Sequence, residues 1–168
     1  MGGRHRKRPL PRGHARRRGV MATPLSPEVI LCDNSFVSRQ ERARSDPAAV
    51  AHWPQDVKDR LETALLAISI FALAEIRAGR VYAGWGEKRS LAQEARLAAF
   101  LTVPLDERVI EEYVKLHAWS LKGHATPHND LWIAATAIAR GIPLVSCDRH
   151  FMAIADDHAL EHIYLPAS

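Results

Sequence analysis

Four acidic residues stand in or beside segments that are otherwise apolar: Asp33, Glu75, Asp130 and Asp148. Burying a carboxylate is costly unless a cation offsets its charge. Hard divalent cations such as Mg²⁺ and Mn²⁺ prefer oxygen ligands, and they commonly combine carboxylates with water and substrate phosphate. If the four acids meet in the fold, the chemistry that they indicate is metal-dependent hydrolysis of a phosphate ester.

Two of these acids directly follow predicted buried strands. The apolar run 29–32 precedes Asp33, and the run 142–147, which contains β-branched residues, precedes Asp148. Active sites of open parallel sheets lie beyond the carboxyl ends of the strands. If the two strands are neighbours, both acids open onto the same edge of the sheet.

The other two acids lie on predicted helices. Asp130 stands near the start of a helix over 128–140, where the helix dipole favours a carboxylate. Glu75 interrupts the apolar segment 70–76, where a charge on the buried side requires a metal ion or a buried cation.

Each acid also has a purely structural interpretation. Asp33 and Asp148 can be cap or turn residues after strands, and Asp130 can be a favourable charge at a helix start. Glu75 can face water beside an arginine of its own helix. Taken together, however, these readings require four coincidences at strand and helix ends of one sheet, so we favour the metal site.

Short polar residues beside the acids are candidates for orienting the carboxylates or a metal-bound water: Asn34, Ser35 and Ser146. Turn and capping roles explain these three equally well. The histidines, including His150, are scattered and do not predict a zinc site.

The elements needed to position these residues alternate along the chain. Strands are predicted at 29–32, 66–69, 101–105, 142–147 and 163–165. Helices are predicted at 35–43, 54–63, 70–82, 87–100, 107–121 and 128–140. This alternation predicts an α/β fold with a mainly parallel sheet flanked by helices. Pro104 breaks the third strand, which we therefore place at the periphery.

Composition is that of an ordinary single-domain globular protein: 168 residues, 47% hydrophobic and 25% charged. The two cysteines lack metal-site spacing and no segment resembles a secretory leader, which favours a reducing cytoplasm. The longest apolar stretch, 65–74, is shorter than the about 20 residues that cross a bilayer. We therefore expect no membrane association.

The net charge of +4 conceals an uneven distribution. Residues 1–20 contain eight arginines and lysines and no acid, so the rest of the chain carries a net charge of −4. Such an extension can bind nucleic-acid phosphates. It can also be a disordered tail without function, or an upstream extension ahead of an alternative start at Met21; its near lack of apolar residues favours these two readings.

Several motifs together resemble those of a known family. They are Asp33-Asn34-Ser35 after the first strand, SIFALAEIRAG at 69–79, HNDLWIAATAIARGIPLV at 128–145 and SCDRHF at 146–151. In order, spacing and apolar surroundings, they resemble PIN domains, specifically the VapC-type ribonuclease toxins of type II toxin–antitoxin systems. The resemblance covers residues 28–166, which we take as the domain, and it implies a PIN-like three-layer fold.

The resemblance also implies an activity and its parts. Members of the family are Mg²⁺-dependent endoribonucleases that use metal-activated water, and Mn²⁺ is an alternative cofactor. By position, Asp33 and Asp130 correspond to the principal metal ligands, with Glu75 and Asp148 completing the acidic pocket. A cognate antitoxin and a homodimer are implied as partners. Asn34 departs from the threonine or serine that is frequent at its position.

Rival functions remain. A PIN-like module can bind RNA or protein without cutting, although intact acids oppose this, and the same metals can serve a phosphatase or a DNA-directed nuclease. Because the domain is acidic, RNA affinity must come from local cations, the metal, a dimer groove or the basic extension. The candidate cations are Arg77, Arg80, Lys88, Arg89, Lys122 and Arg149.

Overall fold

The computed structural model describes residues 27–167, which form a five-stranded parallel sheet in the order β3-β2-β1-β4-β5. The strands are β1 (Val29–Cys32), β2 (Leu65–Ser69), β3 (Leu101–Val103), β4 (Leu144–Ser146) and β5 (His162–Tyr164). The predicted fold class, a parallel sheet flanked by helices, is confirmed. The predicted basic extension, residues 1–20, lies outside the described residues.

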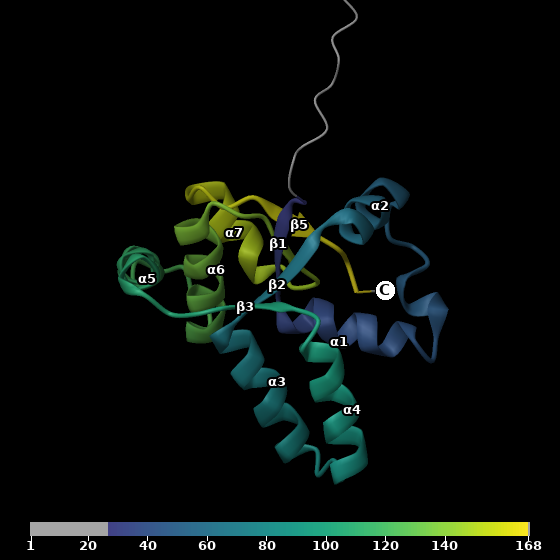
Figure 1. The fold of residues 1–168 in the computed structure, drawn as a ribbon. Coiled ribbons are helices and arrows are strands. Elements are labelled where there is room, and N and C mark those ends of the chain that lie inside the picture. Colours follow the sequence, from purple (N-terminus) through teal and green to yellow (C-terminus); the bar gives the residue numbers. More distant parts are fainter. Residues whose placement is uncertain (1–26, 168) are drawn as a thin grey trace, which may run out of the picture.

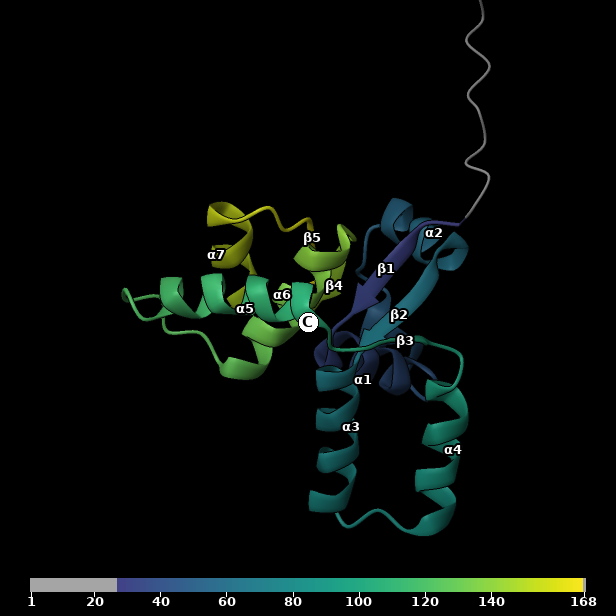
Figure 2. The ribbon, with the colours of Figure 1, turned by 60° about the vertical axis from the view of Figure 1, so that its left-hand side comes forward.

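Helices cover both faces of this sheet, giving three layers. They are α1 (Asn34–Ala43), the short 3-10 helix η1 (Pro47–Val50), α2 (Gln55–Thr63), α3 (Ile70–Tyr82), α4 (Glu87–Leu97), α5 (Glu107–Ser120), α6 (His128–Arg140) and α7 (His150–Asp157). Helices α5, α6 and α7 gather on one side and α1 and α2 on the other (Figure 1). Helices α3 and α4 extend away from the body as an antiparallel pair (Figure 2).

The centre of the sheet is apolar and buried on both faces. In β1 the side chains of Ile30, Leu31 and Cys32 are fully buried, as expected for a strand between two helical layers. β1 pairs with β2 on one side and with β4 on the other. All strands are parallel, so the carboxyl ends of these three neighbours open onto one edge, where the acids after β1 and β4 stand.

Local chemistry explains where the elements begin and end. Ser69 and Asp106 cap α3 and α5 through their side chains, which accept hydrogen bonds from the backbone N–H groups of Ala72 and Val109. Gly141 ends α6 in the left-handed conformation at φ 60°, which glycine adopts without steric cost. These caps agree with the predicted starts of α3 and α5 and with the predicted end of α6.

Several elements differ from the prediction, including β3, which ends at Val103 rather than residue 105. β4 begins at Leu144, two residues late, because the Gly141 turn runs into Pro143, which has no N–H to donate. Helix α4 ends at Leu97 rather than residue 100. Helix α7 was not predicted, because an eight-residue helix is too short for a clear apolar period.

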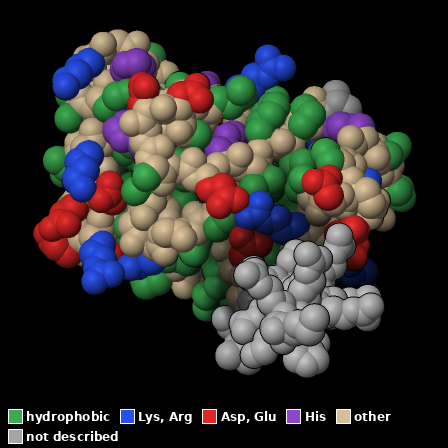
Figure 3. All heavy atoms as spheres, turned by 90° about the horizontal axis from the view of Figure 1, so that it is seen from above, with side chains coloured by type: hydrophobic (Ala, Val, Ile, Leu, Met, Phe, Trp, Pro, Cys, Tyr) green, Lys and Arg blue, Asp and Glu red, His purple; other side chains and the backbone are tan. Residues whose placement is uncertain are grey.

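The surface carries mixed charge. On the face seen in Figure 3, lysine and arginine side chains are separated by acidic and apolar side chains rather than forming one continuous basic surface. Within the part of the chain that the structure describes, no helix has the length and apolar character needed to cross a membrane.

Candidate metal centre

Asp33 lies at the junction between β1 and α1. It is the N-cap of α1, only 5% exposed, and its Oδ2 accepts hydrogen bonds from the backbone N–H (3.0 Å) and the hydroxyl of Ser35. The same hydroxyl accepts from the Cys147 N–H at 2.9 Å, which ties the end of β1 to the end of β4. Burial raises the pKa of Asp33, although the hydrogen bonds from Ser35 oppose this rise.

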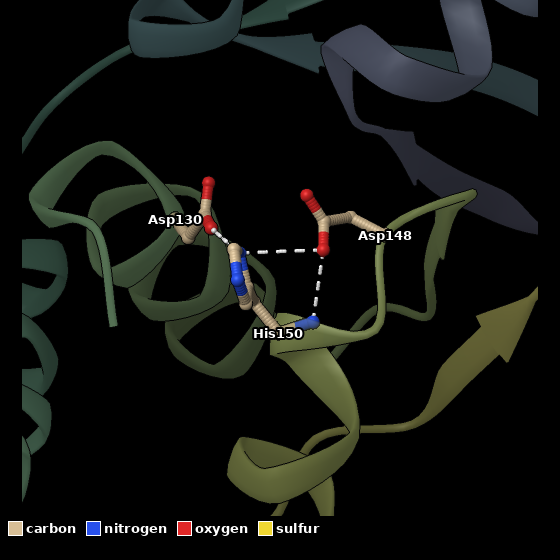
Figure 4. A group of neighbouring side chains, drawn as sticks. All are labelled: Asp130, Asp148 and His150. Atoms are coloured by element: carbon tan, nitrogen blue, oxygen red, sulfur yellow. Dashed lines mark hydrogen bonds and ion pairs between the residues drawn. The ribbon is translucent and has the colours of Figure 1, made fainter. Parts of the chain in front are cut away.

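Asp130 and Asp148 meet across His150 (Figure 4). Asp130 is in the first turn of α6, Asp148 follows β4, and His150 begins α7. The His150 Nδ1 lies 3.0 Å from Asp130 Oδ2 and 3.3 Å from Asp148 Oδ1. One ligand atom from each of the three residues lies within 4.8 Å of the others, which suits a shared cation.

The charged form of the Asp130 carboxyl is destabilised by its surroundings. Burial, assisted by the charges of Asp33 and Asp148, raises its pKa to about 6, while the hydrogen bond from His150 acts in the opposite direction. A carboxylate with so raised a pKa lacks sufficient positive charge nearby. A bound cation would remove this deficit.

Glu75 reaches the same region from α3. Its Oε1 accepts a hydrogen bond from Asn129 Nδ2 at 2.6 Å, so it is tied to the start of α6. Burial raises its pKa, and the charge of Asp33 adds to the effect. The arginines of α3 do not serve it: Arg77 and Arg80 both pair with Glu94.

The four acids therefore come from four separate elements and influence one another. The charge of Asp33 raises the pKa of Glu75 and Asp130, and the charge of Asp148 raises that of Asp33 and Asp130. The tight group consists of Asp130, Asp148 and His150, and it does not include Asp33 or Glu75. Carboxylate oxygens with uncompensated negative charge are the donor set that fits a hard divalent cation.

The short polar residues behave differently from one another. Ser35 holds Asp33, as described above. The Ser146 hydroxyl accepts from the Asp148 N–H at 3.0 Å and lies 3.2 Å from His162 Nε2, so it shapes the turn that carries Asp148. The side chain of Asn34 instead accepts from Ser38 within α1, and only its backbone N–H contacts Asp33.

His150 is the member of this group that the sequence reasoning missed. It stands two residues after Asp148, and its backbone N–H donates to Asp148 Oδ1 at 2.9 Å. This turn folds the imidazole back toward Asp130, a residue of another helix. The Asp-x-His spacing directly after a predicted strand was the available signal.

Comparisons with known proteins agree with this architecture. A family model described as "PIN domain" matches residues 48–157, which include the positions of Glu75, Asp130 and Asp148. Ribonuclease VapC4 of Mycobacterium tuberculosis (strain ATCC 25618 / H37Rv) is 32% identical over 132 residues, which cover 75% of this chain and 91% of VapC4. Ribonuclease VapC5 of the same strain is 31% identical over 137 residues, 80% of this chain and 93% of VapC5.

The fold also matches a solved structure. The crystal structure of VapBC-5 from Mycobacterium tuberculosis, a member of the VapBC family of toxin-antitoxin systems, superposes with a TM-score of 0.60 at 24% identity. The match covers 83% of this chain and 100% of the other. The chain therefore belongs to the PIN-domain family, in the group that includes VapC4 and VapC5.

Proposed function

We propose that this chain is a metal-dependent endoribonuclease that acts as the toxin of a toxin–antitoxin pair. The observation that carries the proposal is the convergence of carboxylates from β1–α1, α3, α6 and the end of β4 on one edge of the sheet. RNA is proposed as the substrate because two relatives, each matched over most of its own length and most of this chain, are named ribonucleases.

Asp33 and Asp130 are proposed as the principal metal ligands, with Glu75 and Asp148 completing the pocket. Mg²⁺ is the favoured ion and Mn²⁺ the alternative, since carboxylates suit both. When bound, such an ion polarises the scissile phosphate and assists deprotonation of the attacking water.

The surrounding residues keep these carboxylates in place. The Ser35 hydroxyl orients Asp33, and the Asn129 amide orients Glu75. His150 donates to Asp130 and lies beside Asp148, so it fixes the gap between the two carboxylates. Fixed carboxylates hold an ion and a phosphate in line for attack more effectively than mobile ones.

The catalytic domain is proposed to span residues 28–166, a wider range than the family model's 48–157, because Asp33 on β1 belongs to the acidic edge. The expected partners are RNA, a cognate antitoxin and a second copy of the chain, in the cytoplasm where RNA is found. The similarity in fold to a VapBC family member supports the antitoxin. Exposed apolar side chains support a homodimer: Ile70, Leu101, Leu105, Ile110 and Val114.

An RNA cleavage assay tests the proposal. Purified protein should cut single-stranded RNA in Mg²⁺ or Mn²⁺ and not in EDTA, and it should leave single-stranded DNA and a phosphomonoester intact. Asp33→Asn and Asp130→Asn should lose cleavage, while Asp156→Asn, an exposed acid of α7, should retain it. Cleavage by Asp33→Asn or Asp130→Asn at the wild-type rate would defeat the assignment.

A further inference from the structure

An open groove of about 310 Å³ borders the candidate metal centre. Its walls come from the loop between α5 and α6 and from the start of α7: His124, Ala125, Thr126, Arg149, His150 and Ala153. His150 belongs both to this groove and to the group with Asp130 and Asp148. A molecule in the groove therefore lies directly beside the metal centre, and the volume is at the lower end of the range for small ligand sites, about 300 Å³.

Arg149 gives this groove a cation without a carboxylate partner among the described residues. Its Nε donates to the Tyr164 hydroxyl at 3.1 Å, and its side chain is exposed. Arg77 and Arg140, by contrast, pair with the carboxylates of α4 and the α5 cap. Guanidinium groups recognise phosphates with directed hydrogen bonds, so Arg149 is free to contact one.

His124 contributes a flat ring to the groove, and stacking on Trp119 fixes the orientation of this ring. It stacks on Trp119 with ring centroids 4.1 Å apart and an interplanar angle of 11°. The indole is itself held, because its Nε1 donates to Asp157 Oδ2 at 2.8 Å and His158 packs edge-on against it. Single-stranded RNA is commonly bound by stacking of its bases on such rings.

We propose that this groove binds the nucleotide that flanks the scissile phosphate, with Arg149 on its phosphate and His124 against its base. The inference rests on the proposed RNA cleavage and locates part of its substrate site. The domain carries net negative charge, which repels RNA phosphates. Arg149, which has no carboxylate partner among the described residues, would offset this repulsion beside the acidic centre. Trp119 acts as a positioning residue, because it orients His124 without lining the groove.

The first test is the substitution Arg149→Gln, measured on a synthetic single-stranded RNA whose cleavage site has been mapped with the wild-type protein. Loss of one charge-assisted contact should raise KM about tenfold, with little change in kcat. Arg44→Gln is the matched control, because Arg44 is exposed at the far end of α1 from Asp33 and should change neither parameter. Equal melting temperatures for the variants would show that each is folded.

The second test locates the contact. Single methylphosphonate linkages, which remove one phosphate charge, are introduced in turn next to the cleavage site. One position should raise the wild-type KM about tenfold and leave the KM of Arg149→Gln unchanged, because the contact is already lost. The sensitive linkage identifies the nucleotide that occupies the groove. Replacing that nucleotide with an abasic site should weaken RNA binding by the wild-type protein more than it weakens RNA binding by the His124→Ala variant.

The outcomes separate the two proposals. A wild-type protein that cleaves no RNA overturns the proposed function and the groove with it. Cleavage with Arg149→Gln equal to the wild type, or an equal response of both proteins at every modified linkage, overturns the groove alone.

Discussion

Removing the Asp130 charge should stabilise the metal-free protein while abolishing its activity. The Asp130 carboxyl is crowded by burial and by the charges of Asp33 and Asp148. Asparagine has nearly the same shape and keeps an oxygen that accepts the hydrogen bond from His150. The substitution Asp130→Asn therefore removes the charge with little change in packing.

The pKa of Asp130 gives the size of the effect. It is raised from an ordinary value of 3.8 to about 6. At about 1.4 kcal/mol for each pKa unit, the charged form costs about 3 kcal/mol in the native state, and partial contact with solvent reduces this to about 1–2 kcal/mol. The native state binds more protons than the unfolded state between these two values. Stability should therefore fall as pH rises from 4 to 6 and stay lower above that window.

Urea unfolding in EDTA at neutral pH measures this directly. Asp130→Asn should exceed the wild type by about 1–2 kcal/mol, while Asp156→Asn, the control, should match the wild type. Magnesium at about ten times its dissociation constant should then add about 1.4 kcal/mol to the wild type and less to Asp130→Asn.

If Asp130→Asn is less stable than the wild type in EDTA, the ionised carboxylate stabilises the metal-free fold, and the argument that it needs a cation is wrong. A wild-type stability that does not fall between pH 4 and 6, relative to Asp130→Asn, leads to the same conclusion.

Substitutions at four further positions test the structure that holds the site. Ser35→Ala should cost about 1–3 kcal/mol in urea unfolding, because Asp33 and a backbone N–H lose their shared partner, and Ser35→Thr should restore part of this. His150→Ala should weaken Mg²⁺ binding about 10- to 100-fold by calorimetry with an unchanged circular dichroism spectrum; equal affinity would exclude its orienting role. Gly141→Ala should cost about 1–2 kcal/mol because of its left-handed backbone. Gly79→Ala, inside α3 with no atom within 4 Å of the added Cβ, should instead stabilise by about 1 kcal/mol, and equal effects of the two would contradict the backbone argument.

The order of elements was predictable because local signals and the fold agree. Helix α6 begins and ends where the apolar period and Gly141 place it, and β3 is the edge strand that Pro104 indicates. The neighbouring position of β1 and β4, stated as a condition for a shared edge, is confirmed. The sequence did not predict α7, and it placed the start of β4 before Pro143 instead of at Leu144. Both elements are short, and short elements carry little periodic signal.

The acids of the candidate site could be predicted from the sequence, but the contacts that hold them could not. Sequence reasoning placed Asp33, Asp130 and Asp148 at strand and helix ends, which topology alone brings together, whereas Glu75 lies within α3. It did not find His150, whose place depends on a tight turn after Asp148 and on the approach of α7 to α6. Nor did it show that Asn129 would hold Glu75, a contact between residues 54 positions apart.

The basic extension can now be weighed against the groove by the salt dependence of RNA binding. For single-stranded nucleic acid, the logarithm of affinity falls with the logarithm of salt concentration by about 0.7 for each phosphate contact. Arg149 alone predicts a slope of about −0.7, whereas contacts by all eight cations of residues 1–20 predict about −6.

Deleting residues 1–20 should therefore leave both cleavage and the slope nearly unchanged, if the acidic domain relies on its metal and on the groove. Anisotropy of a labelled RNA at several salt concentrations measures the slope for both proteins in Mg²⁺, with Asp130→Asn used to prevent cleavage. A steep slope in the full chain that becomes shallow on deletion, together with loss of cleavage in the active protein, would identify the extension as a nucleic-acid arm. RNA binding would then depend on residues outside the range 28–166, and the groove would carry only the local contact beside the scissile phosphate.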